Sequence, residues 1–414
     1  MAAPFRIFIS AGEASGDLYG SLLIAALRQQ VGGVEFFGCG GDRMREAGCE
    51  TLVDARQVAM VGLVEVLPGL PRAWQALRRL VAELRHRRAA LAVLIDFPDF
   101  NLRLARELKQ LDIPVLYFVA PQAWAWRRGR LKLLRRYVDR LFCIFPFEER
   151  FFRQARVPAE FVGHPLVGRV APSLGPEQFR ARYGWPEKLP LVALLPGSRP
   201  KEVRLNLAPM LEAARQLARK KEYGFVLVTP SPAAGEWMRA RLEKERLPFR
   251  VAVNDTYNAV AHAALAIVAS GTATIETALL GTPMVVVYRV SRLSWWLGRL
   301  LVRTPFYSMV NLVAGRQIVP ELIQDDFRPE AVATQAQQLL DNSALREQMQ
   351  ERLKEVVEKL RSPESTAAFP PPGSLDPQPT AGVSAEKNPD AIQRFVAVAE
   401  SMLKGEKVAS ASLG

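Results

Sequence analysis

The sequence predicts an α/β protein with two doubly wound parallel sheets. Short apolar runs alternate with helical patterns from the first residues to about residue 165, and a second alternation begins at residue 190. Strands separated by crossover helices indicate mostly parallel sheets. The run 91–95, Leu-Ala-Val-Leu-Ile, is apolar at every position, which is typical of a strand buried on both faces.

The individual elements follow from hydrophobic periodicity. In the first half, we expect strands at 5–10, 34–38, 91–95, 114–119, 141–145 and 160–162, with helices at 17–30, 71–88, 102–111 and 146–155. In the second half, we expect strands at 190–195, 225–229, 249–253, 264–269 and 284–288, with helices at 201–220, 235–246, 272–280, 292–303, 328–341 and 343–361.

The length of the chain supports two domains. Its 414 residues are 49% hydrophobic and 23% charged, which is normal for a globular protein but long for one core. We place an N-terminal domain at 1–168, a C-terminal domain at 169–361, a Pro-rich disordered tether at 362–389 and a last helix with its tail at 390–414. The Pro-rich stretch 166–186 is expected to link the two halves. Two facing sheets would enclose a cleft, the usual position of a large ligand.

The loop after the first strand has the composition of a binding loop. Residues 10–17 read Ser-Ala-Gly-Glu-Ala-Ser-Gly-Asp, and ligands of doubly wound sheets bind at the carboxyl ends of strands, where this loop would lie. Glycine lets a backbone approach a ligand closely. The candidate residues are Gly12, Glu13, Ser15, Gly16 and Asp17. A tight turn with Asp17 as a helix cap fits the same residues equally well.

A second polar loop follows the buried strand 91–95. Asp96 comes directly after this strand, at a point where a carboxylate can accept a proton from an attacking hydroxyl. Asp99 is expected to cap the helix that begins near Asn101, although the two carboxylates could exchange these roles. From its position, Asp96 is the favoured functional carboxylate.

Two strand ends in the second half have features of nucleotide binding. Strand 190–195 leads into a helix start, whose free N–H groups attract phosphate, and Arg199 adds a two-pronged donor there. Strand 264–269 ends in small residues, and Glu276 follows one turn later, placed to accept hydrogen bonds from a ribose diol. The alternative at Arg199 is a surface turn. The predicted nucleoside-diphosphate residues are Gly197, Ser198, Arg199, Ser270, Gly271, Thr272 and Glu276.

Two further residues are candidates for the cleft. Trp124 follows the strand 114–119 and could contact a sugar or an acyl chain, or else pack at a helix start. His164 lies at the junction of the two domains, where a purely structural histidine fits at least as well.

The net charge of +13 is concentrated in three segments. Residues 71–88, 127–140 and 289–303 carry net charges of +5, +6 and +4, so the rest of the chain is close to neutral. All three contain or adjoin Trp and Leu, which suggests a membrane surface, with nucleic acid or solvated helix faces as alternatives. The segment 292–303 is amphipathic, as a core helix with snorkelling arginines would also be. Its predicted membrane residues are Arg292, Trp295, Trp296, Arg299, Leu300 and Arg303.

Several classes of protein do not fit the sequence. Three scattered cysteines without a C-x-x-C motif indicate a reducing compartment and argue against zinc. A D-x-D motif for a diphosphate-bound metal is also missing. No apolar run reaches the roughly 18 residues that span a bilayer, and the N-terminus lacks the pattern of a signal peptide. We therefore expect a cytoplasmic protein without a metal or cofactor.

Six motifs together resemble those of the lipid-A-disaccharide synthase family of bacterial glycosyltransferases. They keep the family's order and cover residues 6 to about 360. The motifs are Gly-Glu-Ala-Ser-Gly-Asp at 12–17, Ile-Asp-Phe-Pro-Asp-Phe-Asn at 95–101, Trp-Ala-Trp-Arg at 124–127, Leu-Pro-Gly-Ser-Arg at 195–199, Ser-Gly-Thr-Ala with Glu276 at 270–276, and Asn-Leu-Val-Ala-Gly-Arg at 311–316. Each motif is weak alone, but the set is highly specific. The Pro-rich stretch 362–389 departs from the family as an insertion before its last helix.

The resemblance implies a GT-B fold, in which two Rossmann-like domains face each other across a cleft. It implies an inverting, metal-independent transfer from UDP-2,3-diacylglucosamine to 2,3-diacylglucosamine 1-phosphate, with UDP and the β-1,6-linked lipid A disaccharide 1-phosphate as products. It also implies peripheral association with the cytoplasmic face of the inner membrane and a homodimer that can exchange C-terminal segments.

The motifs also suggest roles for individual residues. Asp96, Glu13 and Asp99 remain alternatives for the catalytic base, with Asp96 preferred. The residues expected on the acceptor side or in the cleft are Gly12, Ser15, Gly16, Asp17, Asn101, Trp124, His164, Asn311 and Arg316. The competing interpretations are another sugar-nucleotide enzyme of this fold, such as a UDP-sugar epimerase, and a non-enzymatic protein that binds nucleic acid through its basic segments.

Overall fold

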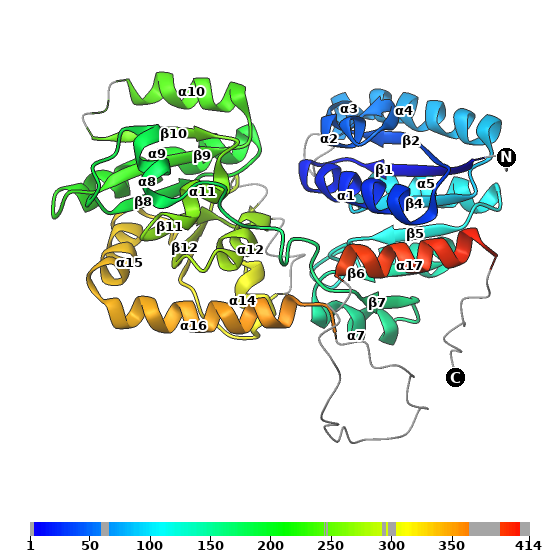
Figure 1. The fold of residues 1–414 in the computed structure, drawn as a ribbon. Helices are drawn as coiled ribbons and strands as arrows, with labels where there is room; N and C mark the ends of the chain where they lie inside the picture. Colours follow the sequence, from blue (N-terminus) through cyan, green and yellow to red (C-terminus); the bar gives the residue numbers. More distant parts are fainter. Residues whose placement is uncertain are drawn as a thin grey trace, which may run out of the picture. The chain divides into compact units, whose positions relative to one another are not determined.

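A computed structural model of the chain describes residues 4–58, 66–243, 245, 247–291, 295–296, 304–363 and 390–405. The chain forms two compact units, of which unit 1 comprises Met1–Pro165 with Arg361–Gly414 and unit 2 comprises Leu166–Leu360. Each unit contains one parallel sheet with helices packed against it (Figure 1). The predicted α/β class with two doubly wound sheets is therefore confirmed.

The sheet of unit 1 has the strand order β3-β2-β1-β4-β5-β6-β7, with every pair of neighbours parallel. Its strands are β1 (Phe5–Ala11), β2 (Val34–Gly40), β3 (Cys49–Asp54), β4 (Leu91–Ile95), β5 (Val115–Phe118), β6 (Arg140–Cys143) and β7 (Ala159–Phe161). The order reverses between β1 and β4, where Ala11 pairs with Ile95. This reversal is the point at which doubly wound sheets bind ligands, and it brings the loops after β1 and β4 together.

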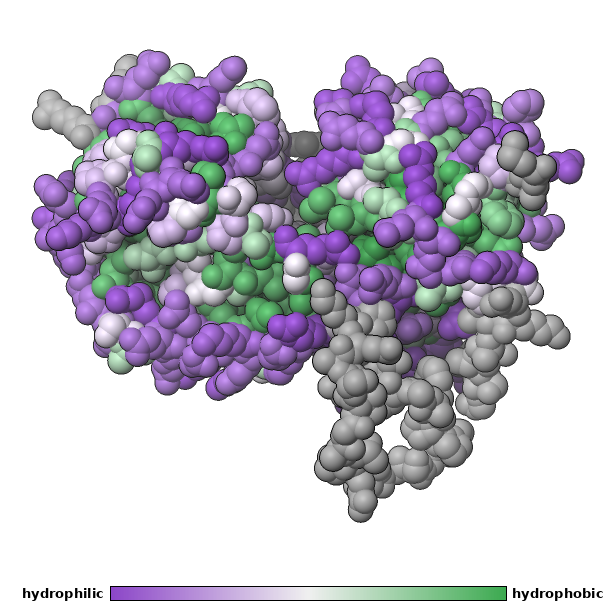
Figure 2. Space-filling model, in the orientation of Figure 1, coloured by the Kyte–Doolittle hydropathy of each residue, from purple (hydrophilic) through white to green (hydrophobic). Residues whose placement is uncertain are grey.

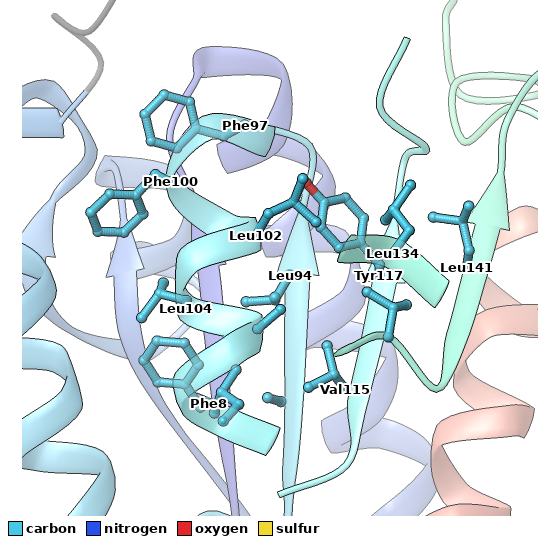
Figure 3. Close-up of a cluster of buried hydrophobic side chains, with 14 of the residues drawn as sticks. Phe8, Leu94, Phe97, Phe100, Leu102, Leu104, Val115, Tyr117, Leu134 and Leu141 are labelled. Carbon is cyan, nitrogen blue, oxygen red and sulfur yellow. The ribbon is translucent and has the colours of Figure 1, made fainter. Parts of the chain in front are cut away.

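The helices of unit 1 enclose a core of apolar side chains. They are α1 (Ala14–Val31), α2 (Asp42–Glu46), α3 (Ala55–Val58), α4 (Val66–Arg87), α5 (Pro98–Gln110), α6 (Arg130–Tyr137), α7 (Pro146–Gln154) and α17 (Ala391–Leu403). Figure 3 shows Phe8 and Leu94 of the sheet packed under Leu104 of α5. The C-terminal helix α17 belongs to this unit, because Phe395 packs against the rings of Phe118 and Phe142, with centroids 5.2 and 4.7 Å away.

The sheet of unit 2 has the order β10-β9-β8-β11-β12-β13 and is also parallel. Its strands are β8 (Leu191–Leu195), β9 (Gly224–Thr229), β10 (Phe249–Val253), β11 (Leu265–Ala269), β12 (Met284–Tyr288) and β13 (Glu321–Ile323). Here the order reverses between β8 and β11, so the loops that follow these two strands are neighbours. The described helices of unit 2 are α8 (Pro176–Tyr183), α9 (Pro200–Ala218), α10 (Pro232–Leu242), α11 (Thr256–Ala261), α12 (Thr272–Leu279), α14 (Met309–Ala314), α15 (Pro329–Asp341) and α16 (Ser343–Leu360).

The structure corrects the expected elements at several places, and its short helices α2, α3, α6, α11 and α14 were not predicted. The strands β3 and β13 were not predicted, because both lie at sheet edges and are short or only partly buried, which weakens the periodic signal. The stretch 166–186, expected to be a linker, contains the helix α8. Pro176 is the first residue of this helix, where its fixed φ suits a helix start, and the side chain of Phe179 in the same helix is fully buried. The Pro-rich composition therefore did not indicate a linker at this place.

Two further expectations concern segments beyond the structural description. The predicted tether lies outside the described residues from 364 to 389, and so does the predicted tail from 406 onward. The predicted helix 292–303 is described only at residues 295 and 296. Figure 2 shows both hydrophilic and hydrophobic side chains on the visible face of each unit.

Candidate active site

Asp96 occupies a backbone turn that is held from two sides. Asp96 and Phe97 have φ values of 44° and 49°, so two consecutive non-glycine residues adopt the left-handed conformation. Such residues cost on the order of 1–3 kcal/mol each and persist only where the surroundings fix them. The Asp96 carbonyl accepts hydrogen bonds from the Tyr117 hydroxyl at 2.6 Å and from Asn101 Nδ2 at 2.8 Å. Figure 3 shows the Tyr117 hydroxyl directed towards the start of α5.

Asn101 also joins the ends of the two central strands. Its Oδ1 accepts a 2.7 Å hydrogen bond from the Ser10 hydroxyl, and its Nδ2 donates to the Ile95 carbonyl at 3.1 Å. Asn101 is completely buried. The predicted cleft residue Asn101 therefore acts on the site through the backbone of its neighbours.

Gly12 provides space for the turn that carries Asp96. A Cβ atom at Gly12 would lie 2.3 Å from the ring of Phe97, which is too close for any side chain. The ring fills the space above Gly12, and Phe97 is the residue that follows Asp96 in the left-handed pair. The conformation of the loop after β4 therefore requires a glycine at position 12 in the loop after β1.

The first loop places Glu13 and Asp17 differently from each other. Glu13 is the N-cap residue of α1 and is half-buried at the carboxyl end of β1, on the same sheet edge as Asp96. Because α1 begins at Ala14, Asp17 lies inside the helix and cannot cap it. Its carboxylate instead accepts N–H bonds of 2.7–3.1 Å from Gly41, Arg43 and Met44, which cap α2. The helix-cap interpretation of Asp17 is therefore wrong, and its carboxylate links α1 to the start of α2. Of the remaining predicted residues in this loop, Ser15 is half-buried and Gly16 is buried.

Asp99 is not the helix cap that was expected. Helix α5 begins at Pro98, with Phe97 as the N-cap residue, so Asp99 lies in its first turn. Its Oδ1 pairs with Arg127 at 2.7 Å and with Arg130 at 2.8 Å. These ion pairs attach the loop after β5 to the start of α5. Pro98 at the first helical position, which favours helix formation, is the sequence signal for the earlier start.

Trp124 is bonded to a residue that sequence reasoning missed. The Nε1–H of Trp124 donates a 3.0 Å hydrogen bond to the carboxylate of Glu148, which is fully buried at the start of α7. Burial raises the pKa of Glu148 to about 8. Pro146 followed two residues later by Glu148 is the spacing of a capped helix start and could have revealed this carboxylate.

His164 is a buried neutral imidazole. Burial lowers the pKa of His164 to about 3, because the charged form would be desolvated. Its ring packs against those of Tyr19 and Phe145, with centroids 6.3 and 5.6 Å away. These contacts favour the structural role over a ligand-binding one.

The loop after β8 leads directly into helix α9. Gly197 has a φ of +126°, and a Cβ there would lie 2.7 Å from Glu202. The exposed guanidinium of Arg199 lies 3.6 Å from the Glu202 carboxylate, which also accepts from the backbone N–H groups of Ser198 and Arg199. The loop therefore presents N–H groups that already bind a carboxylate, as an anion site should.

The neighbouring loop after β11 leads into helix α12. Gly271 precedes this helix with a φ of +153°, and Thr272 is exposed at its first position. The Ser270 hydroxyl donates to the Tyr307 carbonyl at 2.7 Å. Glu276 is half-buried one turn into the helix, and its carboxylate accepts a 3.3 Å bond from the Tyr257 hydroxyl. The structure thus brings the two predicted nucleotide loops together at the switch point of one sheet.

Asn311 and Arg316 both contact other segments of unit 2. Asn311 is fully buried and accepts N–H bonds from Ile318 and Val319, while its Nδ2 donates to Glu321 at 2.7 Å. Its amide thus holds the segment before β13, a structural role. Arg316 is exposed and pairs with Glu355 of α16 at 3.0 Å.

The predicted membrane segment is only partly described. Trp296 is 64% exposed, and the ring of Trp295 packs against Tyr307 at 5.8 Å. The other four predicted residues, Arg292, Arg299, Leu300 and Arg303, lie outside the described residues. Among the helices that the structure describes, none is long and apolar enough to cross a membrane.

The described part of the chain contains no cluster of three or more His, Cys, Asp or Glu side chains suited to a metal ion. The cysteines Cys39, Cys49 and Cys143 are buried thiols, and burial raises the pKa of Cys39 and Cys49 to about 12.

Two doubly wound sheets, each with polar loops at its switch point, define a protein of GT-B-like fold. Solved structures support this class. The UDP-GlcNAc 2-epimerase from Neisseria meningitidis bound to UDP-GlcNAc superimposes with a TM-score of 0.61 at 12% identity, covering 86% of this chain and 99% of that one. A putative UDP-N-acetylglucosamine 2-epimerase from Listeria monocytogenes gives 0.59 at 13% identity, covering 84% and 91%. At these identities the likeness concerns the fold alone.

Sequence comparison is more specific. The family profile of lipid-A-disaccharide synthetases matches residues 7–368. The lipid-A-disaccharide synthase of Solibacter usitatus (strain Ellin6076) is 47% identical over 355 residues, covering 86% of this chain and 93% of the relative. That of Myxococcus xanthus (strain DK1622) is 42% identical over 383 residues, covering 91% and 100%. The chain belongs to the lipid-A-disaccharide synthase family, and it is a glycosyltransferase of lipid A biosynthesis.

Proposed function

We propose that the enzyme transfers a diacylglucosamine unit from UDP-2,3-diacylglucosamine to 2,3-diacylglucosamine 1-phosphate. The products are UDP and the β-1,6-linked lipid A disaccharide 1-phosphate. The observation that carries this proposal is Asp96, a carboxylate fixed in a doubly supported left-handed turn at the switch point of a sheet. Loops suited to a nucleoside diphosphate occupy the switch point of the other sheet.

In the proposed reaction, Asp96 is the general base. Its carboxylate takes the proton of the acceptor 6-hydroxyl while that oxygen attacks the anomeric carbon of the donor. The bond between the anomeric carbon and the diphosphate oxygen breaks, and UDP leaves with the electron pair. The configuration inverts because the hydroxyl attacks from the face opposite the diphosphate. Glu13 on the same sheet edge is the alternative base, whereas the ion pairs of Asp99 with Arg127 and Arg130 make Asp99 the weakest of the three candidates.

The second unit would hold the nucleotide. The guanidinium of Arg199 and the N–H groups at the starts of α9 and α12 would bind the diphosphate, which displaces the Glu202 carboxylate from Ser198 and Arg199. Glu276 would accept hydrogen bonds from the ribose hydroxyls. These donors can neutralise the leaving diphosphate without a metal, so activity is expected to survive an excess of chelator.

The proposal also includes a place in the cell. The substrates carry acyl chains, and Trp296 exposes a large apolar surface next to a basic segment. Peripheral binding to the cytoplasmic face of the inner membrane would let the enzyme reach both substrates in the bilayer. In this chain, Phe395 of α17 packs against Phe118 and Phe142 of the same copy. A homodimer would form if two copies exchanged α17, so that each Phe395 packed against these two rings of the other copy.

The test is an assay of the purified full chain with both acylated sugars in detergent. Release of UDP together with a disaccharide 1-phosphate, and only when both sugars are present, is the expected result. An isomerised UDP-sugar formed without acceptor would instead favour the epimerase alternative, which the shared fold makes the second candidate.

A further inference from the structure

Glu148 is a buried carboxylate that the proposed reaction does not use. Only 1% of the residue is exposed. Its Oε2 accepts a 3.2 Å hydrogen bond from the backbone N–H of Phe145 and so caps α7, while its Oε1 accepts from Trp124 Nε1 at 3.0 Å. Helix capping explains the hydrogen bond to Oε2. It does not explain why the side chain is buried, because Glu residues mostly lie at the protein surface. The burial and the second bond therefore need another explanation.

The position is unfavourable for a charge. Burial raises the pKa of Glu148 to about 8, and the nearby negative charge of Asp96 adds to this effect. An apolar side chain of similar size would fill the same space without desolvating a carboxylate. Local rules of stability are broken in this way chiefly at functional sites.

Trp124 lies at the same sheet edge as the proposed base. The strands β4, β5 and β6 are neighbours, and the segments that follow them carry Asp96, Trp124 and Glu148 in that order. The carboxyl ends of neighbouring parallel strands meet at one edge of a sheet, so Asp96 and Glu148 belong to the same edge. The indole bonded to Glu148 belongs to this edge as well.

The orientation of Trp124 is fixed by its bond to Glu148 and by a ring contact. Phe147 packs edge-on against its ring with a centroid distance of 5.0 Å and an angle of 90°. The loop that carries Trp124 is itself held at its end. Arg130, the buried first residue of α6, pairs with Asp99 at 2.8 Å, and its guanidinium lies over the Trp126 ring at 4.9 Å. Trp124 itself is half-buried, so part of its fixed ring remains open to a ligand.

We propose that Glu148 is a positioning residue that holds the Trp124 indole beside Asp96, where the exposed part of the ring packs against the acceptor sugar. This inference rests on the proposed glycosyl transfer. The acceptor is the expected ligand because its attacking hydroxyl must reach Asp96, whose sheet edge Trp124 shares. Aromatic side chains supply the apolar walls of small-molecule sites, and a ring with a fixed rotamer does so without an ordering cost.

The experiment compares Trp124→Phe and Glu148→Gln with the parent enzyme as full chains. Phe keeps an apolar ring but lacks the N–H donor, and Gln keeps one acceptor oxygen but cannot ionise. Both variants are expected to raise the acceptor KM about tenfold, as loss or weakening of one buried hydrogen bond should. The donor KM and the UDP affinity are expected to stay near the parent values. Glu149→Gln is the matched control, because Glu149 lies in the same turn and pairs with Arg153 at 2.7 Å.

A double variant makes the test independent of folding losses. If Glu148 acts through Trp124, the effects of the two substitutions on the acceptor KM are less than additive. Additive effects, an unchanged acceptor KM or a rise in the donor KM would each overturn the inference. If Glu148→Gln does not fold, Trp124→Phe alone decides by the same KM criterion. A parent enzyme that releases no UDP overturns the proposed function and this inference with it, whereas an active parent with unaffected variants overturns only the inference.

Discussion

The hydroxyl of Tyr117 donates a 2.6 Å hydrogen bond to the backbone carbonyl of Asp96. Tyr117 lies on β5 and is fully buried, so the strand next to β4 supports the turn in which β4 ends. Burial raises the pKa of Tyr117 well above its usual value, which keeps the phenol protonated as a donor. This bond and that of Asn101 stabilise a backbone conformation that Asp96 would otherwise avoid.

Tyr117→Phe is expected to lower kcat more than it raises either KM. The substitution removes one buried hydrogen bond, which costs about 1 kcal/mol of stability, and leaves in place the bond that Asn101 donates to the Asp96 carbonyl. Steady-state kinetics and urea unfolding check the two effects separately, with Tyr137→Phe in α6 as the control. A destabilised variant with the parent kcat would show that Tyr117 supports the fold and not the base.

Asp96→Asn is expected to reduce kcat by about 10²–10⁴-fold, because an amide cannot accept the proton of the acceptor hydroxyl. The affinity for UDP, measured by calorimetry, should remain nearly unchanged, since the nucleotide loops belong to the other unit. Near-normal turnover would transfer the role of base to Glu13 or, less readily, to Asp99.

Arg199→Ala is expected to weaken UDP binding by about 1.5–3 kcal/mol through loss of a charge-assisted hydrogen bond. The guanidinium is 61% exposed, so little packing is lost with it. Calorimetry with UDP is the measurement, and Arg182→Ala, another exposed arginine of unit 2, is the control. Unchanged affinity in Arg199→Ala and in Glu276→Gln would show that the nucleotide binds elsewhere.

His164 predicts a loss of stability in acid. Burial lowers its pKa from 6.5 to about 3 in the folded state, so between these values the unfolded chain binds the proton and the folded chain does not. Stability is then complete above pH 6.5 and falls as the pH decreases towards 3, by at most about 1.4 kcal/mol for each pH unit. In urea unfolding between pH 7 and 5, His164→Gln should show a shallower decline than the parent and than a His86→Gln control. Parallel curves for parent and His164→Gln would contradict the prediction.

The exposed tryptophan surface predicts reversible membrane binding. The parent protein should sediment with anionic vesicles at low salt and dissociate at high salt, because each basic residue near such a surface contributes about 1 kcal/mol and salt screens it. The variant Trp295→Ser/Trp296→Ser/Arg299→Glu should bind less, while Trp237→Ser, which changes a tryptophan that is 41% exposed in the same unit, should not. Equal binding of parent and triple variant would assign this segment to the core.

Most of the fold could be predicted from the sequence, because buried parallel strands leave a strong local signal. The strand Leu91–Ile95 was predicted at its observed bounds from its unbroken apolar run. The edge strand Cys49–Asp54 was not, because its exposed face removes that run. Helix Pro176–Tyr183 was missed for a different reason, since prolines that start helices also occur in linkers.

The sequence could predict which residues of the site follow strand ends, but it could not predict their contacts. Asp96 was located by its position directly after a buried strand, and Arg199 by its place in the turn that follows another. The partners that decide what a residue does were not visible, because they come from distant segments. Asp17 binds the amides of residues 41, 43 and 44, and Asn311 binds those of residues 318 and 319. Glu148 was overlooked because its partner Trp124 lies 24 residues away.

By itself, the sequence determined the α/β class, the two strand-end loops of each half and, through six short motifs, the family. These depend on local periodicity and on residue types at fixed spacing. Only the tertiary structure decided that Gly12 makes room for Phe97, that Tyr117 and Asn101 fix the Asp96 turn, and that a buried Glu148 holds Trp124. Burial, hydrogen-bond partners and pKa depend on distances between segments far apart in the chain, and folding alone sets those distances.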